Sequence, residues 1–221
     1  MNKRIFDIFF SATGLFLLSP LLVVIAFMIW ACDGLPVLFR QARVGKNGRE
    51  FILFKFRTMS LPAPGVEAAF DVGDTKRVTR PGSFFRKTKL DELPQLWNVL
   101  KGDMSFVGPR PEVREWVDAY SERWAQVHQV RPGITDPASI YFRNEEDLLV
   151  KSEDPKAFYR DHILPQKLDL YIQYVNTQSF RSDVSLIFKT ILAVFLPGRF
   201  AGHPHQAFKD KVADSLIRKE P

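Results

Sequence analysis

The 221-residue sequence predicts a mostly helical α+β protein with an N-terminal membrane anchor. Residues 1–39 are predicted to form the anchor, because residues 8–32 carry no charged side chain, and a re-entrant membrane helix hairpin is the favoured form. Residues 40–198 are predicted to form a small membrane-associated domain of interfacial amphipathic helices and short strands. The roughly 180 residues after residue 39 suffice for one domain with a hydrophobic core. Residues 199–221 are predicted to be a polar tail.

The uncharged run could cross a bilayer once, but a proline near its middle argues for a break. As a straight helix the run would be about 37 Å long, against a hydrocarbon core of about 30 Å. Pro20 has no amide hydrogen to donate to the carbonyl of Phe16, so the helix is expected to kink or break there. Ser19 can ease the break by bonding a carbonyl of the preceding turn.

Cations flank both ends of the run. Lys3 and Arg4 precede it, and four more cations follow it: Arg40, Arg43, Lys46 and Arg49. The positive-inside rule therefore favours the cytoplasm for both ends, which a hairpin that enters and leaves by one leaflet satisfies. A kinked single span is the first alternative. A cleaved signal peptide is the second, and it is disfavoured because the run is long and bulky Trp30 lies where small residues are needed.

The positive charge is concentrated in two segments. The net charge is +6, and residues 40–57 and 76–89 are rich in Lys and Arg. Beside a membrane anchor, such surfaces suit anionic lipid headgroups or phosphorylated substrates. No helix-turn-helix, zinc-finger or RNP-type pattern is present, so no nucleic-acid partner is expected. The single cysteine, Cys32, excludes an intrachain disulfide and a cysteine-rich zinc site.

Hydrophobic periodicity and turn residues predict the elements of the domain. Residues 51–56 are predicted to form a short strand, and residues 60–75, with their prolines and glycines, an irregular loop. Residues 112–128 carry an apolar stripe at helical spacing, which is expected in the core or on a membrane-facing surface. Asp154 is predicted to cap a helix that Pro165 interrupts or restarts. Residues 184–196 are too short to span a bilayer and lie either in the interface plane or in the core.

The residues with chemical potential gather in residues 85–112. Apolar side chains at positions 93, 96, 97 and 100 predict a helix, and Pro94 places its start near Asp91. Asp91 and Glu92 then lie at the positive end of the helix dipole, near several cations. Such a pair suits a divalent cation or a nucleophile that attacks phosphorus, although an ordinary capped helix start is the simpler alternative. Arg110, held between two prolines, suits a diphosphate.

Three segments in order carry a resemblance to a known family: "FKFRTM", "LDELPQLWNVLKGDMSFVGPRP" and "RPGIT". They resemble the bacterial sugar transferases, the monotopic polyprenyl-phosphate phosphoglycosyl transferases, from Lys3 to about Leu196. The resemblance implies a re-entrant membrane helix broken at a Ser-Pro pair, in the bacterial inner membrane, with the catalytic domain on the cytoplasmic face. It also implies transfer of a sugar phosphate from a UDP-sugar to polyprenyl (undecaprenyl) phosphate, with Mg²⁺ and release of UMP. The product would begin a cell-surface glycan such as an exopolysaccharide or lipopolysaccharide.

The same resemblance implies a role for each matching residue. Asp91 would be the nucleophile that forms an aspartyl phospho-sugar, and Glu92 its acidic partner, with both as the metal ligands. Phosphate groups would be bound by Arg86, Lys101 and Arg110. The nucleotide or sugar would meet Arg131, Pro132, Gly133 and Thr135. A homodimer is compatible with these residues.

The sequence departs from the family pattern at two places. Lys89 stands where many members have Ser, and Asp136-Pro137 follows "RPGIT" where many have Gly and an aromatic residue. We expect these changes to alter the sugar or uridine contacts more than the activity itself. Two other functions fit the same residues: a membrane-associated magnesium-dependent phosphohydrolase, and a non-catalytic membrane scaffold.

Overall fold

The computed structural model describes residues 3–61, 77–142, 145–150 and 152–195, and these residues are mostly helical. The predicted tail and nearly all of the predicted loop at 60–75 lie outside the described residues. The described elements follow in this order: α1 (Lys3–Asp33), β1 (Leu38–Val44), η1 (Lys46–Gly48), β2 (Glu50–Phe56), α2 (Arg80–Thr88), η2 (Leu90–Glu92), α3 (Gln95–Lys101), β3 (Ser105–Val107), α4 (Arg114–Asp118), α5 (Ser121–Val127), β4 (Gly133–Thr135), α6 (Pro137–Tyr141), α7 (Glu145–Val150), α8 (Pro155–Phe158), η3 (Tyr159–Ile163), α9 (Leu164–Thr177) and α10 (Phe180–Phe195).

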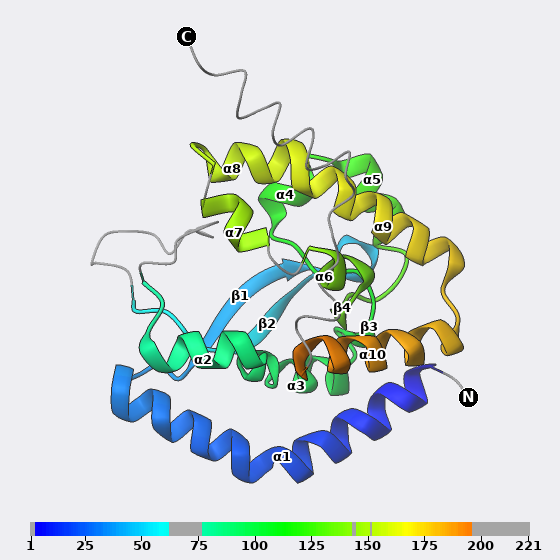
Figure 1. Ribbon diagram of the computed structural model, residues 1–221. Helices are drawn as coiled ribbons and strands as arrows, with labels where there is room; N and C mark the ends of the chain where they lie inside the picture. Colours follow the sequence, from blue (N-terminus) through cyan, green and yellow to red (C-terminus); the bar gives the residue numbers. More distant parts are fainter. Residues whose placement is uncertain (1–2, 62–76, 143–144, 151, 196–221) are drawn as a thin grey trace.

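The elements lie in tiers around a small hairpin (Figure 1). Helix α1 runs along one side, and α2, α3 and α10 lie next to it. The hairpin of β1 and β2 is antiparallel, with Leu38 opposite Phe56 and Val44 opposite Glu50, which confirms the strand predicted at residues 51–56. Helices α4 to α9 cover the side away from α1. Two further short strands, β3 and β4, form a second pair, which is parallel.

The main core lies under α4, α5 and α9. It contains the predicted stripe, because Trp116, Val117, Trp124 and Val127 are all buried against α9 residues such as Tyr171. The predicted single helix over 112–128 is wrong in one respect. The chain leaves helical geometry at Tyr120, whose φ is −140° and ψ 48°, so two short helices replace one. The break lets both helices turn their apolar side chains into the same core.

The predicted helix start at Asp154 is confirmed. The Asp154 carboxylate accepts a hydrogen bond of 3.0 Å from the backbone N–H of Ala157, and Pro155 occupies the first turn of α8. Pro165 likewise lies in the first turn of α9, after a single π-helical stretch, η3. The proline therefore restarts the helix, as its missing N–H predicts.

Helix α1 is bent and unbroken. The chain stays helical through Pro20, and Figure 1 shows α1 as a wide V with its bend near the middle. The Ser19 hydroxyl donates to the carbonyl of Phe16 at 2.7 Å, which satisfies the acceptor that Pro20 cannot serve. The structure thus has one kinked helix with splayed arms, and the re-entrant membrane hairpin stays a prediction.

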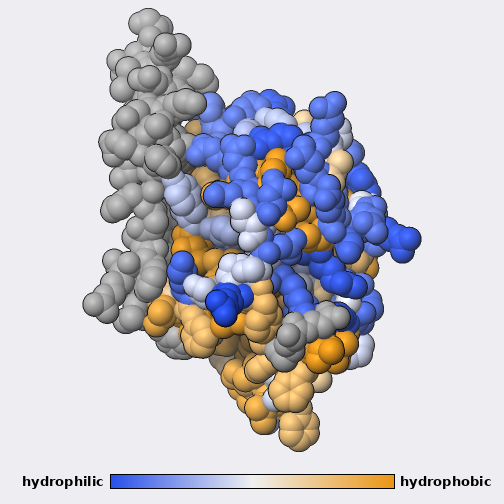
Figure 2. Space-filling view, turned by 90° about the vertical axis from the view of Figure 1, so that its right-hand side faces the viewer, coloured by the Kyte–Doolittle hydropathy of each residue, from blue (hydrophilic) through white to orange (hydrophobic). Residues whose placement is uncertain are grey.

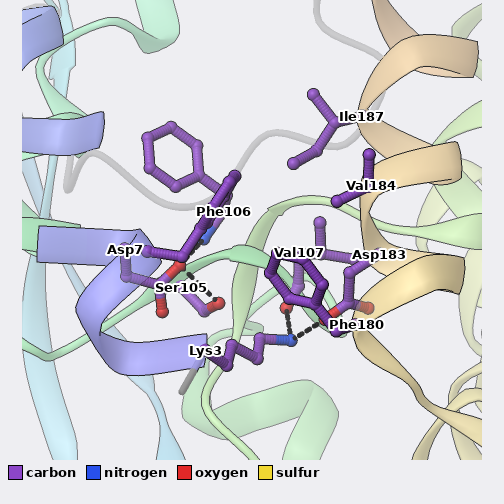
Figure 3. A pocket seen from close by; sticks show the side chains of 10 residues that line it. Lys3, Asp7, Ser105, Phe106, Val107, Phe180, Asp183, Val184 and Ile187 are labelled. Carbon is purple, nitrogen blue, oxygen red and sulfur yellow. Dashed lines mark hydrogen bonds and ion pairs between the residues drawn. The ribbon is translucent and has the colours of Figure 1, made fainter. Parts of the chain in front are cut away.

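The first arm of α1 is fixed to the domain by polar side chains (Figure 3). The Lys3 ammonium donates to the Val107 carbonyl at 2.8 Å and pairs with Asp183 of α10 at 2.6 Å. The Asp7 carboxylate accepts from the Ser105 hydroxyl at 3.1 Å. Arg4 donates to the carbonyls of Val99 and Leu100 at the end of α3. The two cations that the sequence offers as topology signals are thus also structural anchors.

The second arm of α1 is fixed to the same domain. The Arg57 guanidinium, at the end of the "FKFRTM" segment, donates to the carbonyls of Asp33 and Gly34 at 2.5 and 2.7 Å. Ile25 and Ile29 are buried in an apolar cluster with Phe56 and Phe85. Both ends of α1 therefore rest on one body, and the bend points away from it (Figure 1).

The side of the molecule that carries α1 is apolar. Figure 2 shows hydrophobic residues gathered at this lower end and hydrophilic ones above. Phe16 and Leu17, near the bend, are 78% and 68% exposed. Phe84, Trp97 and Phe188 extend the exposed apolar surface onto α2, α3 and α10. Among the described helices, α1 alone is long and apolar enough to cross a membrane.

Residues 184–196 are predicted to lie either in the membrane interface or in the core. The two faces of helix α10, which contains most of them, differ in this respect. Ala193 is buried, and the Thr190 hydroxyl bonds that of Thr135 at 2.5 Å, so one face packs on the domain. Phe188 and Ile191 are 62% and 47% exposed on the other face. The helix is therefore both a core element and part of the exposed apolar surface.

Candidate active site

The two adjacent acids lie in a turn between two helices. Helix α2 ends at Lys89, which adopts a left-handed conformation with φ 59°. A single 3₁₀ turn, η2, then carries Asp91 and Glu92, and α3 begins only at Gln95. The predicted helix start near Asp91 is thus about four residues early, because Pro94 lies just before the first helical residue. Lys89 ends α2 through its backbone, and its side chain is exposed.

Glu92 is buried between two cations. Its Oε1 accepts from the Lys55 ammonium at 3.1 Å and from Arg110 Nη2 at 2.8 Å. Burial alone would raise the pKa of Glu92, but Arg110 and Lys55 together hold this pKa well below its usual value. Glu92 is therefore an ionised carboxylate whose main task in the resting site is to hold Lys55 and Arg110 in place.

The Asp91 carboxylate differs from that of Glu92 in its hydrogen bonding. Its side chain is buried, and its Oδ1 makes no hydrogen bond within the described residues. Burial raises the pKa of Asp91, the neighbouring Glu92 raises it further, and Lys55, Lys89 and Arg110 oppose the rise. A buried carboxylate oxygen without a donor is costly unless it has another use. The arrangement leaves Asp91 as the one acid of the pair that is available to a ligand or a phosphorus atom.

Lys55 is a site residue that the sequence reasoning missed. It lies on β2, and the hairpin brings it to an acid 37 positions later in the chain. Burial, with Arg110 nearby, lowers the pKa of Lys55 to about 8. The available signal was a lone cation inside the apolar strand "FILFKF", which is unusual for a strand that packs on a core.

Arg110 is held rigidly from several sides. Its two flanking prolines restrict the backbone, and the carbonyl of Pro111 accepts from Arg43 at 3.1 Å. Arg43 also pairs with Glu112 at 3.0 Å, and Glu112 accepts a hydrogen bond of 2.5 Å from the Tyr159 hydroxyl. Glu92 is the largest influence on Arg110 and raises its pKa well above the usual value. The guanidinium is therefore a fixed positive charge beside Asp91 and Glu92.

The other predicted phosphate-binding residues differ in position. Arg86 lies half-buried in the last turn of α2, just before the acidic turn. Lys101 lies at the far end of α3, where it is about half exposed and pairs with Asp103 at 3.0 Å. The structure thus groups Asp91 with Lys55, Glu92 and Arg110, and places Lys101 at the opposite end of the helix that follows Asp91.

The "RPGIT" segment packs against the segment that carries Arg110. Arg131 donates to the Gly102 carbonyl at 2.8 Å. Gly133 crosses Gly108 so closely that a Cβ at Gly133 would lie 2.1 Å from the Gly108 nitrogen. Pro132 and Thr135 are buried on either side of it. These contacts fix the Gly-Pro-Arg-Pro loop that carries Arg110, and their predicted role toward a nucleotide or sugar is untested.

The unusual Asp136-Pro137 pair begins a helix. Asp136 is fully buried, its Oδ1 accepts a hydrogen bond of 2.9 Å from the backbone N–H of Ser139, and Pro137 occupies the first turn of α6. Burial raises the pKa of Asp136, while its Ser139 bonds and nearby Arg110 act against this. The acid is therefore a helix cap close to the site.

A comparison with known families decides the family. The model of the family described as "Bacterial sugar transferase" matches residues 1–197. The chain belongs to the bacterial sugar transferase family. The order of its motifs, the buried acid pair and the N-terminal apolar helix all fall inside the matched region.

Curated relatives of this sugar transferase carry informative names. The chain is 38% identical over 198 residues to the UDP-N-acetylgalactosamine-undecaprenyl-phosphate N-acetylgalactosaminephosphotransferase of Aeromonas hydrophila. This alignment covers 87% of the chain and 43% of that protein. The chain is 36% identical over 194 residues to the UDP-glucose:undecaprenyl-phosphate glucose-1-phosphate transferase of Caulobacter vibrioides, covering 86% and 68%. It is 37% identical over 197 residues to the sugar transferase EpsL of Bacillus subtilis, covering 88% and 87%. The chain thus spans less than half of the first relative and most of the third.

Proposed function

We propose that this protein transfers a sugar phosphate from a UDP-sugar to undecaprenyl phosphate or a similar polyprenyl phosphate, releasing UMP. The observation that carries the proposal is the buried site in which Asp91 has an unpaired oxygen beside Lys55 and Arg110. The printed names of the relatives supply the substrate classes. The product, a polyprenyl diphosphate sugar, would be the first lipid-linked intermediate of a cell-surface glycan.

The proposed reaction has two displacements at one phosphorus atom. An Asp91 carboxylate oxygen attacks the β-phosphorus of the UDP-sugar, and the bond from that phosphorus to the bridging oxygen breaks, so UMP leaves with the electron pair. The resulting aspartyl phospho-sugar is then attacked by an oxygen of the polyprenyl phosphate. The bond to Asp91 breaks, and its carboxylate is regenerated. A soluble donor and a lipid acceptor can then use one site in turn.

The neighbouring residues suit the charge that this chemistry handles. A carboxylate that attacks a diphosphate meets like charge, which fixed cations reduce. Arg110 and Lys55 are already held by Glu92, so they need little reorganisation when phosphate oxygens arrive. Arg86, from the last turn of α2, is proposed as a further phosphate ligand. Arg131 and Thr135 are proposed near the nucleotide or sugar.

The site also suits a magnesium ion bound partly by substrate. Among the described residues no group of three or more His, Cys, Asp or Glu side chains is placed to hold a metal. Magnesium often binds through one or two carboxylates and the phosphates of its substrate. The unpaired Asp91 oxygen fits that pattern, whereas Glu92 would have to share its oxygens with Lys55 and Arg110. When bound, the ion would neutralise charge on the diphosphate.

We further propose that α1 enters and leaves the inner membrane from its cytoplasmic face. Both arms of α1 are anchored on one domain, through Lys3 and Arg57, while Phe16 near the bend is exposed. A helix that crossed the bilayer would have to release one of these anchors. The exposed Phe84, Trp97 and Phe188 side chains would then rest in the same leaflet. This geometry would bring the acidic turn to the level of the lipid phosphates.

The direct test is an assay of UMP release. The purified protein is mixed with magnesium and a panel of UDP-sugars, with and without polyprenyl phosphate. Multiple turnovers should require the lipid, and the lipid should gain the mass of the phospho-sugar. Multiple turnovers without lipid, giving free sugar phosphate, would indicate a phosphohydrolase. No UMP with any donor would contradict the proposal.

A further inference from the structure

Asn98, in the middle of α3, makes an unusual contact with the hairpin. Its side chain is completely buried. Its Oδ1 accepts from the backbone N–H of Phe54 at 3.1 Å, and its Nδ2 donates to the carbonyl of Ile52 at 2.7 Å. Within the part of the chain that the structure describes, strand β2 has only β1 as a strand partner. The Asn98 amide therefore gives β2 the donor and acceptor that a second neighbouring strand would otherwise supply.

The backbone of Asn98 holds the other end of α3. Its carbonyl accepts from the N–H groups of Gly102, Asp103 and Met104 at 3.0 to 3.2 Å. These bonds end the helix and start the turn into β3. One buried residue thus fixes β2, α3 and the turn after α3 relative to one another.

The contact lies beside the Lys55–Glu92 ion pair. Phe54, bonded by Asn98, immediately precedes Lys55, whose ammonium lies 3.1 Å from Glu92. Glu92 in turn lies in the turn before α3. The hairpin and the acidic turn are thus connected twice, by the Lys55–Glu92 pair and by the Asn98 amide. A lysine side chain is long and flexible, so it cannot by itself set the distance between the two elements.

We propose that Asn98 is a positioning residue that locks β2 against α3 and so keeps the Lys55 ammonium at Glu92, beside Asp91. The importance of this pair for transfer rests on the proposed function above. The lock itself does not, because it concerns only the placement of Lys55. The two claims can therefore be tested apart.

The placement of Lys55 can be measured without any turnover. Acetylation of the folded protein by a limiting amount of acetic anhydride at one fixed pH, read by mass spectrometry of the Lys55 peptide, reports how accessible the Lys55 amine is. In the wild type the Lys55 side chain is 19% exposed, so its labelling should be slow relative to that of the exposed Lys46. In Asn98→Ala the freed strand should expose Lys55, so its labelling relative to Lys46 should rise several-fold. Unchanged relative labelling in the variant would overturn the proposal.

A second variant keeps the size of the side chain. In Asn98→Asp the protonated carboxyl can still donate to Ile52 and accept from Phe54, but the ionised form cannot donate. UMP release, relative to wild type, should therefore be greatest at low pH and fall as pH rises, by about tenfold or more. A loss of activity that is constant with pH would indicate a general packing role and contradict the proposal. Asp154→Ala, which removes a remote helix cap, should lower the melting temperature and leave both the relative labelling of Lys55 and the pH profile of UMP release unchanged.

Discussion

The Lys55 ammonium lies 3.1 Å from the Glu92 carboxylate, although one residue belongs to the β-hairpin and the other to the turn between α2 and α3. Arg110 reaches the same Glu92 oxygen from a third segment, at 2.8 Å. Glu92 therefore organises the cations, and Asp91 keeps an oxygen free of hydrogen bonds.

Removing the Lys55 charge should impair the reaction. In Lys55→Gln, Glu92 loses one ion-pair partner and keeps the other, Arg110, so fewer positive charges remain for the diphosphate. We expect turnover to fall by about 100-fold, as when one preorganised donor is lost from an active site. UMP release in the presence of lipid measures the effect. Lys46→Gln, which removes an exposed cation of the same basic segment, is the matched control and should behave as wild type.

The dependence of kcat/KM on pH should be bell-shaped. As the proposed nucleophile, Asp91 must be ionised to attack, and burial raises its pKa. As the pH decreases, activity should therefore be lost at a higher pH than with an ordinary aspartate. Lys55, with a pKa of about 8, should lose its charge on the alkaline side. In Lys55→Arg the alkaline fall should move to higher pH while the acid side stays. An alkaline fall that is the same in both proteins would rule out Lys55 as its source.

Both ends of α1 should lie on the cytoplasmic side of the membrane. Single cysteines at Asn2 and Arg49, in a Cys32→Ser background, should both be protected from an impermeant thiol reagent in intact cells. Each should react after the membrane is permeabilised. Labelling of one site alone in intact cells would demonstrate a true span and would contradict the re-entrant topology.

The bend of α1 should depend on Ser19 and Pro20. Replacing them with Ala and Leu restores the missing N–H donor and removes the proline, which costs a helix interior about 3 kcal/mol. A straighter α1 cannot keep both Lys3 and Arg57 on their partners. We therefore expect the double variant to lose activity and to expose one of the two cysteine sites. Retention of both topology and activity would mean that the bend is set elsewhere.

Local sequence rules succeeded where one short segment decides the structure. The cap at Asp154, the restart at Pro165 and the strand before Arg57 follow from neighbouring residues alone. The helix over 112–128 failed because its apolar stripe does not reveal the break at Tyr120, which depends on both halves packing into one core. The start of α3 was placed too early for a similar reason, because a 3₁₀ turn precedes Pro94.

The candidate site was predictable only in part. Asp91, Glu92 and Arg110 lie in one continuous motif, so their juxtaposition needs little tertiary information. Lys55 reaches Glu92 only through the hairpin and its contact with α3, which no local pattern encodes. The tasks of Arg4 and Lys3 as anchors likewise depend on contacts with residues about 100 or more positions away.

The central claim, that Asp91 is the nucleophile, is tested most directly by trapping its adduct. Wild-type protein with magnesium and its UDP-sugar, but without lipid, is quenched rapidly in acid, digested and analysed by mass spectrometry. We expect about one UMP per site and a phospho-sugar mass on the peptide that contains Asp91. Asp91→Asn should give neither, and Glu92→Gln, which keeps the attacking group, should still form the adduct more slowly. No adduct in the wild type, with UMP appearing only once lipid is added, would contradict the account and indicate direct transfer.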